Sequence, residues 1–484
     1  MTTHPPIPIA APRESASAVP SLATIALTGY LVLTVAGLAG AGGRAFAPIW
    51  AVASAVTALA LVTRMPGGYL AFIVTLWFYT PLVRRILDMH HGYIPQSLAL
   101  AAPVLASTVS VWTVIRFARE LRGTLFAPAI LVIAAVTYGF LVGALRNGFV
   151  PAFYAYLAWL SPALVGLHTA LHWRRYPEMK RVLLRTLAWG VGPAALYGIY
   201  QFAVLPIWDR IWMIGTNLQS IGAPEPFALR VFGSMTMPGT FAVVMQVTLL
   251  LLLSAEVRGR LPTLVLSFIG LLLSRIRTAW LGFVLGLVLQ FITQPVRKLP
   301  RNWITIAVVA VLSLPVITIP RFREGIAQRI SSLTTAGDDS SVKQRLLVAR
   351  AGYALVLDYA EGAGLGATGS AVTRNARGGI RNFENGLLEV FYLFGWPGGL
   401  MFFLGLLGIV VQGMRLADAQ FDPFANAVRS AAAALLASLL ISEIFTGAAG
   451  TLFWVLIGFG VSAHAYNLAS GATVAYRLSQ ARFR

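Results

Sequence analysis

Apolar stretches long enough to cross a lipid bilayer recur along the chain from near Ser21 to near Leu468. About 20 consecutive apolar residues in a helix cover the roughly 30 Å hydrocarbon core of a membrane. We count about fourteen such stretches, and the closely spaced pairs near Phe46 and Leu261 can be merged or split differently. The pattern therefore predicts an all-α fold, a polytopic membrane helix bundle of about 12–14 transmembrane helices.

The longest polar interruption of this pattern is a large loop from Arg321 to Asn385. Within it, apolar residues recur at helical spacing between Val342 and about Asp358, which predicts an amphipathic helix that lies on the membrane or against the bundle. The glycine-rich run 362–366 has no βαβ context and reads as a turn. Because long loops are rare unless they are functional, we expect chemistry or recognition here.

The same pattern divides the chain into six regions. They are a disordered cytoplasmic tail (1–20), N-terminal transmembrane helices (21–205), transmembrane helices with arginine-bearing periplasmic turns (206–320), the large periplasmic loop (321–385), C-terminal transmembrane helices (386–470) and a basic cytoplasmic tail (471–484).

Composition agrees with a membrane protein. Hydrophobic residues make up 57% of the chain and charged residues only 11%, and the mean hydropathy is +0.75, far outside the range of soluble globular domains. The chain contains no cysteine, which excludes a disulfide framework, a thiolate metal site and a cysteine nucleophile.

The net charge of +20 is explained by topology rather than by a nucleic-acid partner. Basic residues cluster in the short loops at every second crossing, which is the positive-inside pattern and places both termini in the cytoplasm. We therefore expect no nucleic-acid binding. The clusters are Arg116/Arg119/Arg122, Arg174/Arg175/Lys180/Arg181, Arg258/Arg260, Arg297/Lys298/Arg301, Arg415/Arg429 and Arg477/Arg482/Arg484.

Arginines on the predicted outer side run against this rule. Arg210 and Arg230 lie in the segment 206–235, whose prolines and Gly222 predict a stiff, non-helical loop, and Arg275 and Arg277 lie in a tight turn between two spans. An anionic ligand would explain them, and interfacial snorkelling of the side chains is the alternative.

Glu384 is the best single candidate for an acid or base. It lies at the end of the large loop, beside the start of an apolar span, where partial removal from water would raise the pKa of its carboxyl as a general base near neutrality needs. A carboxylate stabilised by the dipole of the following helix is a compatible reading. Glu389 is five residues further on and is not expected to form a close pair with Glu384. The neighbouring His90 and His91 lack further ligands at metal-binding spacing.

Four pieces in fixed order resemble the O-antigen ligase/polymerase superfamily of bacterial surface-polysaccharide membrane proteins. The resemblance covers roughly residues 195–415, and the succession of Gln201, Trp208-Asp209 and Arg230-Val231-Phe232 looks like the exopolysaccharide branch. The pieces are Arg230-Val231-Phe232-Gly233 with Met237-Pro238-Gly239, Ser274-Arg275-Ile276-Arg277-Thr278-Ala279-Trp280, the Arg345 helix with the glycines 362–366, and Asn382-Phe383-Glu384-Asn385-Gly386 running to Gly395-Trp396-Pro397-Gly398.

The resemblance implies a glycosyl transfer on the outer face of the bacterial inner membrane, from a glycan linked to undecaprenyl pyrophosphate to an acceptor glycan. It implies that arginines hold the pyrophosphate, here Arg230 and Arg277, with Arg275 competing with Arg277 and with Arg345 as a further candidate. Glu384 would then be the catalytic base and Asn385 would orient the acid or a sugar. The resemblance implies no cofactor and no metal, and it leaves room for a chain-length regulator or other polysaccharide-assembly proteins as partners.

One departure separates the two activities of the superfamily. Ligases that attach O-antigen to the lipid A core typically carry a histidine directly before the asparagine of the last motif, where this chain has Glu384. The departure favours a polymerase of exopolysaccharide or O-antigen, with ligation to a lipid A-core or other acceptor as the alternative. A lipid-linked glycan flippase or transporter is the alternative from another class, and it predicts internal repeats and ionisable residues at mid-span.

Overall fold

The computed structural model describes residues 21–123, 125–294, 299–320, 323, 350, 352–368, 383 and 385–472. Within these ranges the regular elements are all helices, and the one β-bridge is an isolated pair between Gly222 and Leu229. The all-α fold is thereby confirmed. The chain is a multi-pass membrane protein, since eight of the described helices are long and apolar enough to cross a bilayer and five further apolar helices have 10–17 residues.

The first half of the bundle contains eight α-helices, whose bounds are α1 Leu22–Leu38, α2 Phe46–Arg64, α3 Pro66–His91, α4 Ala102–Thr108, α5 Val111–Arg116, α6 Ala127–Arg146, α7 Phe149–Leu171 and α8 Tyr176–Val204. The described part of the second half contains α9 Ile207–Thr216, α10 Pro238–Leu253, α11 Arg260–Leu273, α12 Arg277–Thr293, α13 Leu299–Ile317, α16 Gly386–Gly413, α17 Leu416–Phe421, α18 Pro423–Ser438 and α19 Gly447–Ala469. Short 3₁₀ turns lie at Gly43–Ala45, Leu98–Ala101, Glu120–Arg122, Trp173–Arg175 and Gln219–Ile221.

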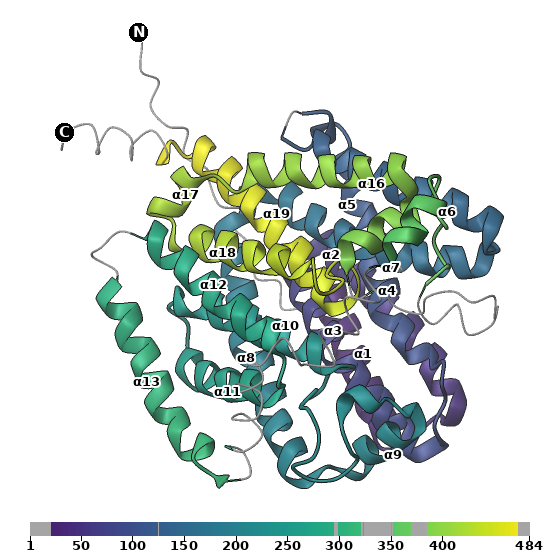
Figure 1. The fold of residues 1–484 in the computed structure, drawn as a ribbon, viewed down its shortest axis with the longest axis vertical. Coiled ribbons are helices and arrows are strands. Elements are labelled where there is room, and N and C mark those ends of the chain that lie inside the picture. The colour runs from purple at the N-terminus through teal and green to yellow at the C-terminus, as the bar shows by residue number, and fades with distance from the viewer. Residues whose placement is uncertain are drawn as a thin grey trace.

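Helix α19 lies in the interior of the bundle, between α7, α16 and α18, whereas α13 lies at its edge beside α11 (Figure 1). Small residues allow α7 and α19 to approach closely. A Cβ atom on Gly458 would lie 2.2 Å from the carbonyl oxygen of Gly166, and one on Gly166 would lie 2.5 Å from that of Trp454. Close packing of backbones at such small residues stabilises helix pairs in membranes, where the lipid provides no hydrophobic driving force.

The predicted non-helical loop 206–235 is partly wrong, because α9 occupies its first part. Pro206 precedes the helix with an extended backbone, and its ring does not interrupt the helical hydrogen bonds that follow. Trp212 and Met213 are buried on the inner face of α9, while Arg210 is exposed. The irregular part of the segment begins only after Ile221.

The glycine-rich run 362–366 is a turn, as predicted, and it is inserted between α6 and α16. The amide of Leu365 donates to the carbonyl of Gly139, and the amide of Gly364 donates to the carbonyl of Leu393. The side-chain amide of Asn147 donates to the carbonyls of Ala363 and Leu365. Hydrogen bonds to α6, to α16 and to Asn147 therefore hold this part of the large loop against the bundle.

Gly364 is the tightest point of this turn. Its φ is +81°, and a Cβ atom there would lie 2.3 Å from the amide nitrogen of Gly143. We predict that Gly364→Ala lowers the stability by about 1–3 kcal/mol or more, because alanine is strained at this φ and also collides with the α6 backbone. Melting of the purified protein in detergent measures the change. Gly190→Ala is the matched control, since no atom lies within 4 Å of its Cβ position, and equal melting of the two variants would contradict the prediction.

Candidate active site

An irregular segment, residues 228–237, links the loop after α9 to α10, and we call it the strap. The amide of Arg230 donates to the carbonyl of Ile221 at 2.7 Å, and the amide of Val231 donates to the carbonyl of Leu273 at 3.2 Å. Leu273 is the last residue of α11, directly before the turn that carries Arg275 and Arg277. The structure thus brings together the two arginine segments that the sequence places far apart.

The arginine turn, residues 274–277, has its own internal hydrogen bonds. The hydroxyl of Ser274 donates to the carbonyl of Leu271 at 2.6 Å and accepts from the amide of Ile276 at 3.3 Å. The indole of Trp280 donates to the same Leu271 carbonyl at 2.8 Å. These bonds stabilise a strained residue, since Arg275 has a φ of +55° in the left-handed region.

Arg275 and Arg277 occupy different positions on this turn. The guanidinium of Arg275 lies over the ring of Phe202 in α8, 5.5 Å from its centroid, which is a cation–π arrangement. Arg277 is the first residue of α12, and both side chains are half-buried. A cation at the N-terminus of a helix opposes the helix dipole by about 0.3–1 kcal/mol, which an anion bound at this end would offset.

Two helices begin at this place without a side-chain cap. Met237 precedes α10 and Ile276 precedes α12, and neither apolar side chain can accept a hydrogen bond from the first turn as a serine or aspartate would. Helices α10 and α12 pack against each other (Figure 1). Two neighbouring helix N-termini therefore lie beside the segments that carry Arg230, Arg275 and Arg277, and helix N-termini attract anions.

Asn385 lies at the beginning of α16 and caps it. Its side-chain oxygen accepts from the amide of Leu388 at 3.1 Å, and the next residue, Gly386, donates its amide to the carbonyl of Leu439 at 2.9 Å. The hydrogen bond of Gly386 holds the end of the last motif against the start of the loop that joins α18 and α19. Arg345 and Glu384, the other two predicted site residues, lie outside the described residues.

Two further carboxylates lie near this cap, and the sequence analysis did not select either one. Glu389, one turn into α16, accepts a hydrogen bond from the hydroxyl of Thr368 at 3.2 Å. Glu443 lies in the loop between α18 and α19, where its carboxylate accepts from the amides of Phe445 and Thr446. Burial raises the pKa of the Glu443 carboxyl above its ordinary value of 4.5. No sequence motif distinguishes Glu443, because the turn that orients it becomes visible only in the fold.

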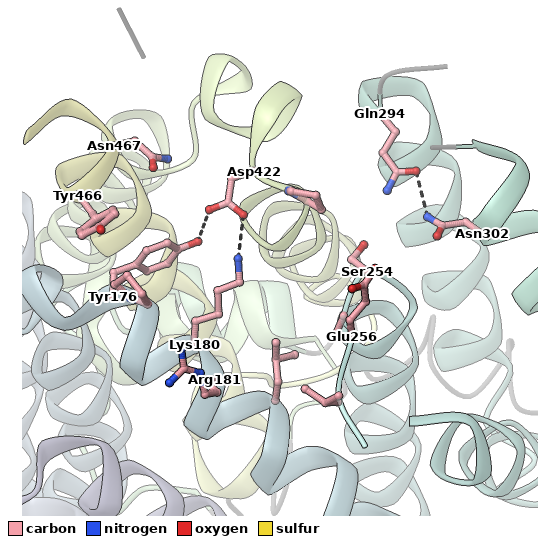
Figure 2. Close-up of a pocket in the computed structure, with 15 residues that line it drawn as sticks. Tyr176, Lys180, Arg181, Ser254, Glu256, Gln294, Asn302, Asp422, Tyr466 and Asn467 are labelled. Carbon is pink, nitrogen blue, oxygen red and sulfur yellow. Dashed lines mark hydrogen bonds and ion pairs between the residues drawn. The ribbon is translucent and has the colours of Figure 1, made fainter. Parts of the chain in front are cut away.

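A polar cavity of about 770 Å³ lies at the opposite end of α8, α10 and α12. Figure 2 shows Asp422 directed at the Tyr176 hydroxyl and at the Lys180 ammonium, with Gln294 and Asn302 hydrogen-bonded on the far wall. Acidic and basic groups are mixed in its lining, which also includes Glu256 and Arg181. It contains none of the predicted site residues. Among the described residues, no group of three or more histidine, aspartate or glutamate side chains could hold a metal ion.

Residues 262–403 match the family model of O-antigen ligase. The match confirms the predicted resemblance to the O-antigen ligase/polymerase superfamily and indicates a membrane glycosyltransferase of that general type. No curated protein matches the chain.

The matched segment contains the arginine turn and the Asn385 cap, whereas Arg230 and Glu443 lie outside it. Segments on both sides of the matched part therefore form hydrogen bonds with it. The strap reaches it from the N-terminal side through the hydrogen bond to Leu273, and the loop after α18 reaches it through the hydrogen bond from Gly386.

The Glu443 loop yields a stability prediction. Glu443→Ala leaves two backbone amides without their acceptor and should cost about 1–3 kcal/mol, whereas Glu443→Gln retains an acceptor oxygen and should be tolerated. A raised carboxyl pKa means that the folded state binds the proton more tightly, so the wild-type protein loses stability as the pH rises above about 4.5. The melting temperature of the glutamine variant relative to wild type should therefore increase with pH. A constant difference from pH 4.5 to pH 8 would contradict this account.

Proposed function

We propose that the protein is a polymerase of a bacterial surface polysaccharide, either exopolysaccharide or O-antigen. It transfers a glycan from undecaprenyl pyrophosphate to the hydroxyl of an acceptor sugar on the periplasmic face of the inner membrane. The meeting of the strap and the arginine turn, through the hydrogen bond between Val231 and Leu273, is the observation that carries the proposal. This contact places the arginine-bearing segments and two helix N-termini at one end of the bundle. Guanidinium groups and helix N-termini are groups that bind phosphates.

The arginines act on the leaving group. As the anomeric C–O bond breaks, its electron pair passes to undecaprenyl pyrophosphate, and the negative charge on the phosphate oxygens grows. Guanidinium groups held in place before the reaction stabilise this charge more strongly in the transition state than in the ground state, which lowers the barrier. Arg230 and Arg277 are the proposed ligands, and Arg275 and Arg345 are further candidates.

Glu384 is the proposed general base. It takes the proton of the acceptor hydroxyl, whose oxygen then attacks the anomeric carbon from the side opposite the pyrophosphate, so the transfer inverts the configuration. Its chain neighbour Asn385 is fixed by capping α16, which holds this part of the chain in place beside the bundle. The step needs no cofactor and no metal, because the guanidinium groups neutralise the leaving group.

Ligation of a polymer to a lipid A-core or other acceptor is the second candidate, and the match to the O-antigen ligase family is compatible with it. The chemistry at the donor is the same, and the two activities differ in the acceptor. A deletion strain separates them. Single lipid-linked repeat units should accumulate if the protein polymerises, and long unattached polymer would instead assign it as a ligase.

We predict that Arg277→Ala and Glu384→Gln each abolish long polymer in cells at normal protein levels. The first removes a ligand of the leaving group and the second removes the base, and each loss is expected to slow transfer by about 100-fold or more. Polymer length on a gel is the measurement. Arg210→Ala is the matched control, because Arg210 is an exposed arginine on α9. Normal polymer in the Arg277 and Glu384 variants would contradict the assignment.

A further inference from the structure

The middle of the strap is buried although it is not helical. Val231 and Phe232 have no exposed surface, and Gly233 is buried as well. Irregular backbone inside a membrane protein persists only where protein groups satisfy its amides and carbonyls. The partners of the strap therefore decide where Arg230 lies.

Gln201 of α8 satisfies two of these groups. Its side-chain oxygen accepts from the amide of Phe232 at 3.1 Å and from the amide of Gly233 at 2.9 Å. Its side-chain nitrogen donates to the carboxylate of Asp209 at 2.6 Å. A single glutamine thus joins the strap to α9.

Arg85 of α3 binds the strap at Gly233, the residue whose amide Gln201 also binds. Its guanidinium donates to the carbonyl of Gly233 at 2.6 Å and forms an ion pair with Asp209 at 3.2 Å. The side chains of Arg85 and Asp209 are 1% and 0% exposed. Hydrogen bonds offset part of the cost of burying such a pair, and here Tyr197 donates a further bond to Asp209 at 2.6 Å. Nη1 of Arg85 has no hydrogen-bond partner among the described residues.

We propose that Gln201, Asp209 and Arg85 are positioning residues that hold the strap so that Arg230 faces the pyrophosphate. This inference rests on the proposed function for the identity of the ligand. All three residues lie before the segment that matches O-antigen ligase. The proposal gives α3, α8 and α9 a part in the active site. These helices carry none of the predicted catalytic or pyrophosphate-binding residues.

Gln201→Leu tests the proposal, because it removes the shared acceptor while it keeps the size of the side chain and leaves both charges in place. Gln246→Leu is the matched control. Gln246 is a glutamine of α10 that is equally buried, and its side chain has no hydrogen-bond partner among the described residues.

The absence of native cysteine allows spin labels to be placed at two chosen sites. Ala228 at the start of the strap and Leu281 on α12 are both exposed and suit this purpose. The distance distribution between the labels should be narrow in the wild-type background and in Gln246→Leu, and broad in Gln201→Leu. The affinity for undecaprenyl pyrophosphate in lipid nanodiscs should fall by about tenfold or more in Gln201→Leu and stay within about twofold in Gln246→Leu.

The possible outcomes are separable. An unchanged distance distribution in Gln201→Leu overturns the positioning role. A broad distribution with unchanged affinity shows that the network holds the strap but that the strap does not bind pyrophosphate, which overturns the proposed function. If Gln201→Leu does not fold, Tyr197→Phe is the milder variant. It removes one hydrogen bond to Asp209 and the one that Tyr197 accepts from the indole of Trp208, but it leaves Gln201 bonded to the strap. It should broaden the distribution less, and a distribution as narrow as that of wild type would count against the network.

Discussion

Buried, non-helical backbone is the constraint on which this structure depends. In a bilayer, an irregular segment must find all of its hydrogen-bond partners within the protein. The strap finds them in Gln201, Arg85 and the end of α11, and the glycine-rich turn 362–366 finds them in α6 and α16. Both segments therefore lie in defined places.

The electrostatics of the site follow from the same arrangement. Because Val231 is bonded to Leu273, the strap and the arginine turn converge where α10 and α12 begin. Helix N-termini and guanidinium groups are both suited to bind an anion, which is why the proposed pyrophosphate is placed here. At the other end of the bundle, acidic and basic groups are mixed around the cavity, and Lys180 there is paired with Asp422.

Hydrophobic length and charge alternation predicted the helical bundle, and the unusual position of the outer arginines predicted two segments that the fold does bring together. Local rules failed where tertiary contacts decide. Prolines around Pro206 suggested a loop, but the apolar face of α9 packs onto the bundle and stabilises a helix. The buried pair of Arg85 and Asp209 joins residues that are distant in the sequence, and Glu443 depends on a turn, so neither has a signature in the sequence. The place of Glu384 in the sequence is the basis of its proposed role, because it lies outside the described residues.

A structure of the protein with undecaprenyl pyrophosphate in a lipid nanodisc, determined by electron cryo-microscopy, tests the central claim most directly. The account predicts that the pyrophosphate lies between the strap and the arginine turn, within hydrogen-bond distance of the guanidinium groups of Arg230 and Arg277. Pyrophosphate bound elsewhere, for example in the cavity beside Lys180 and Asp422, with the two arginines directed away from it, would contradict the account.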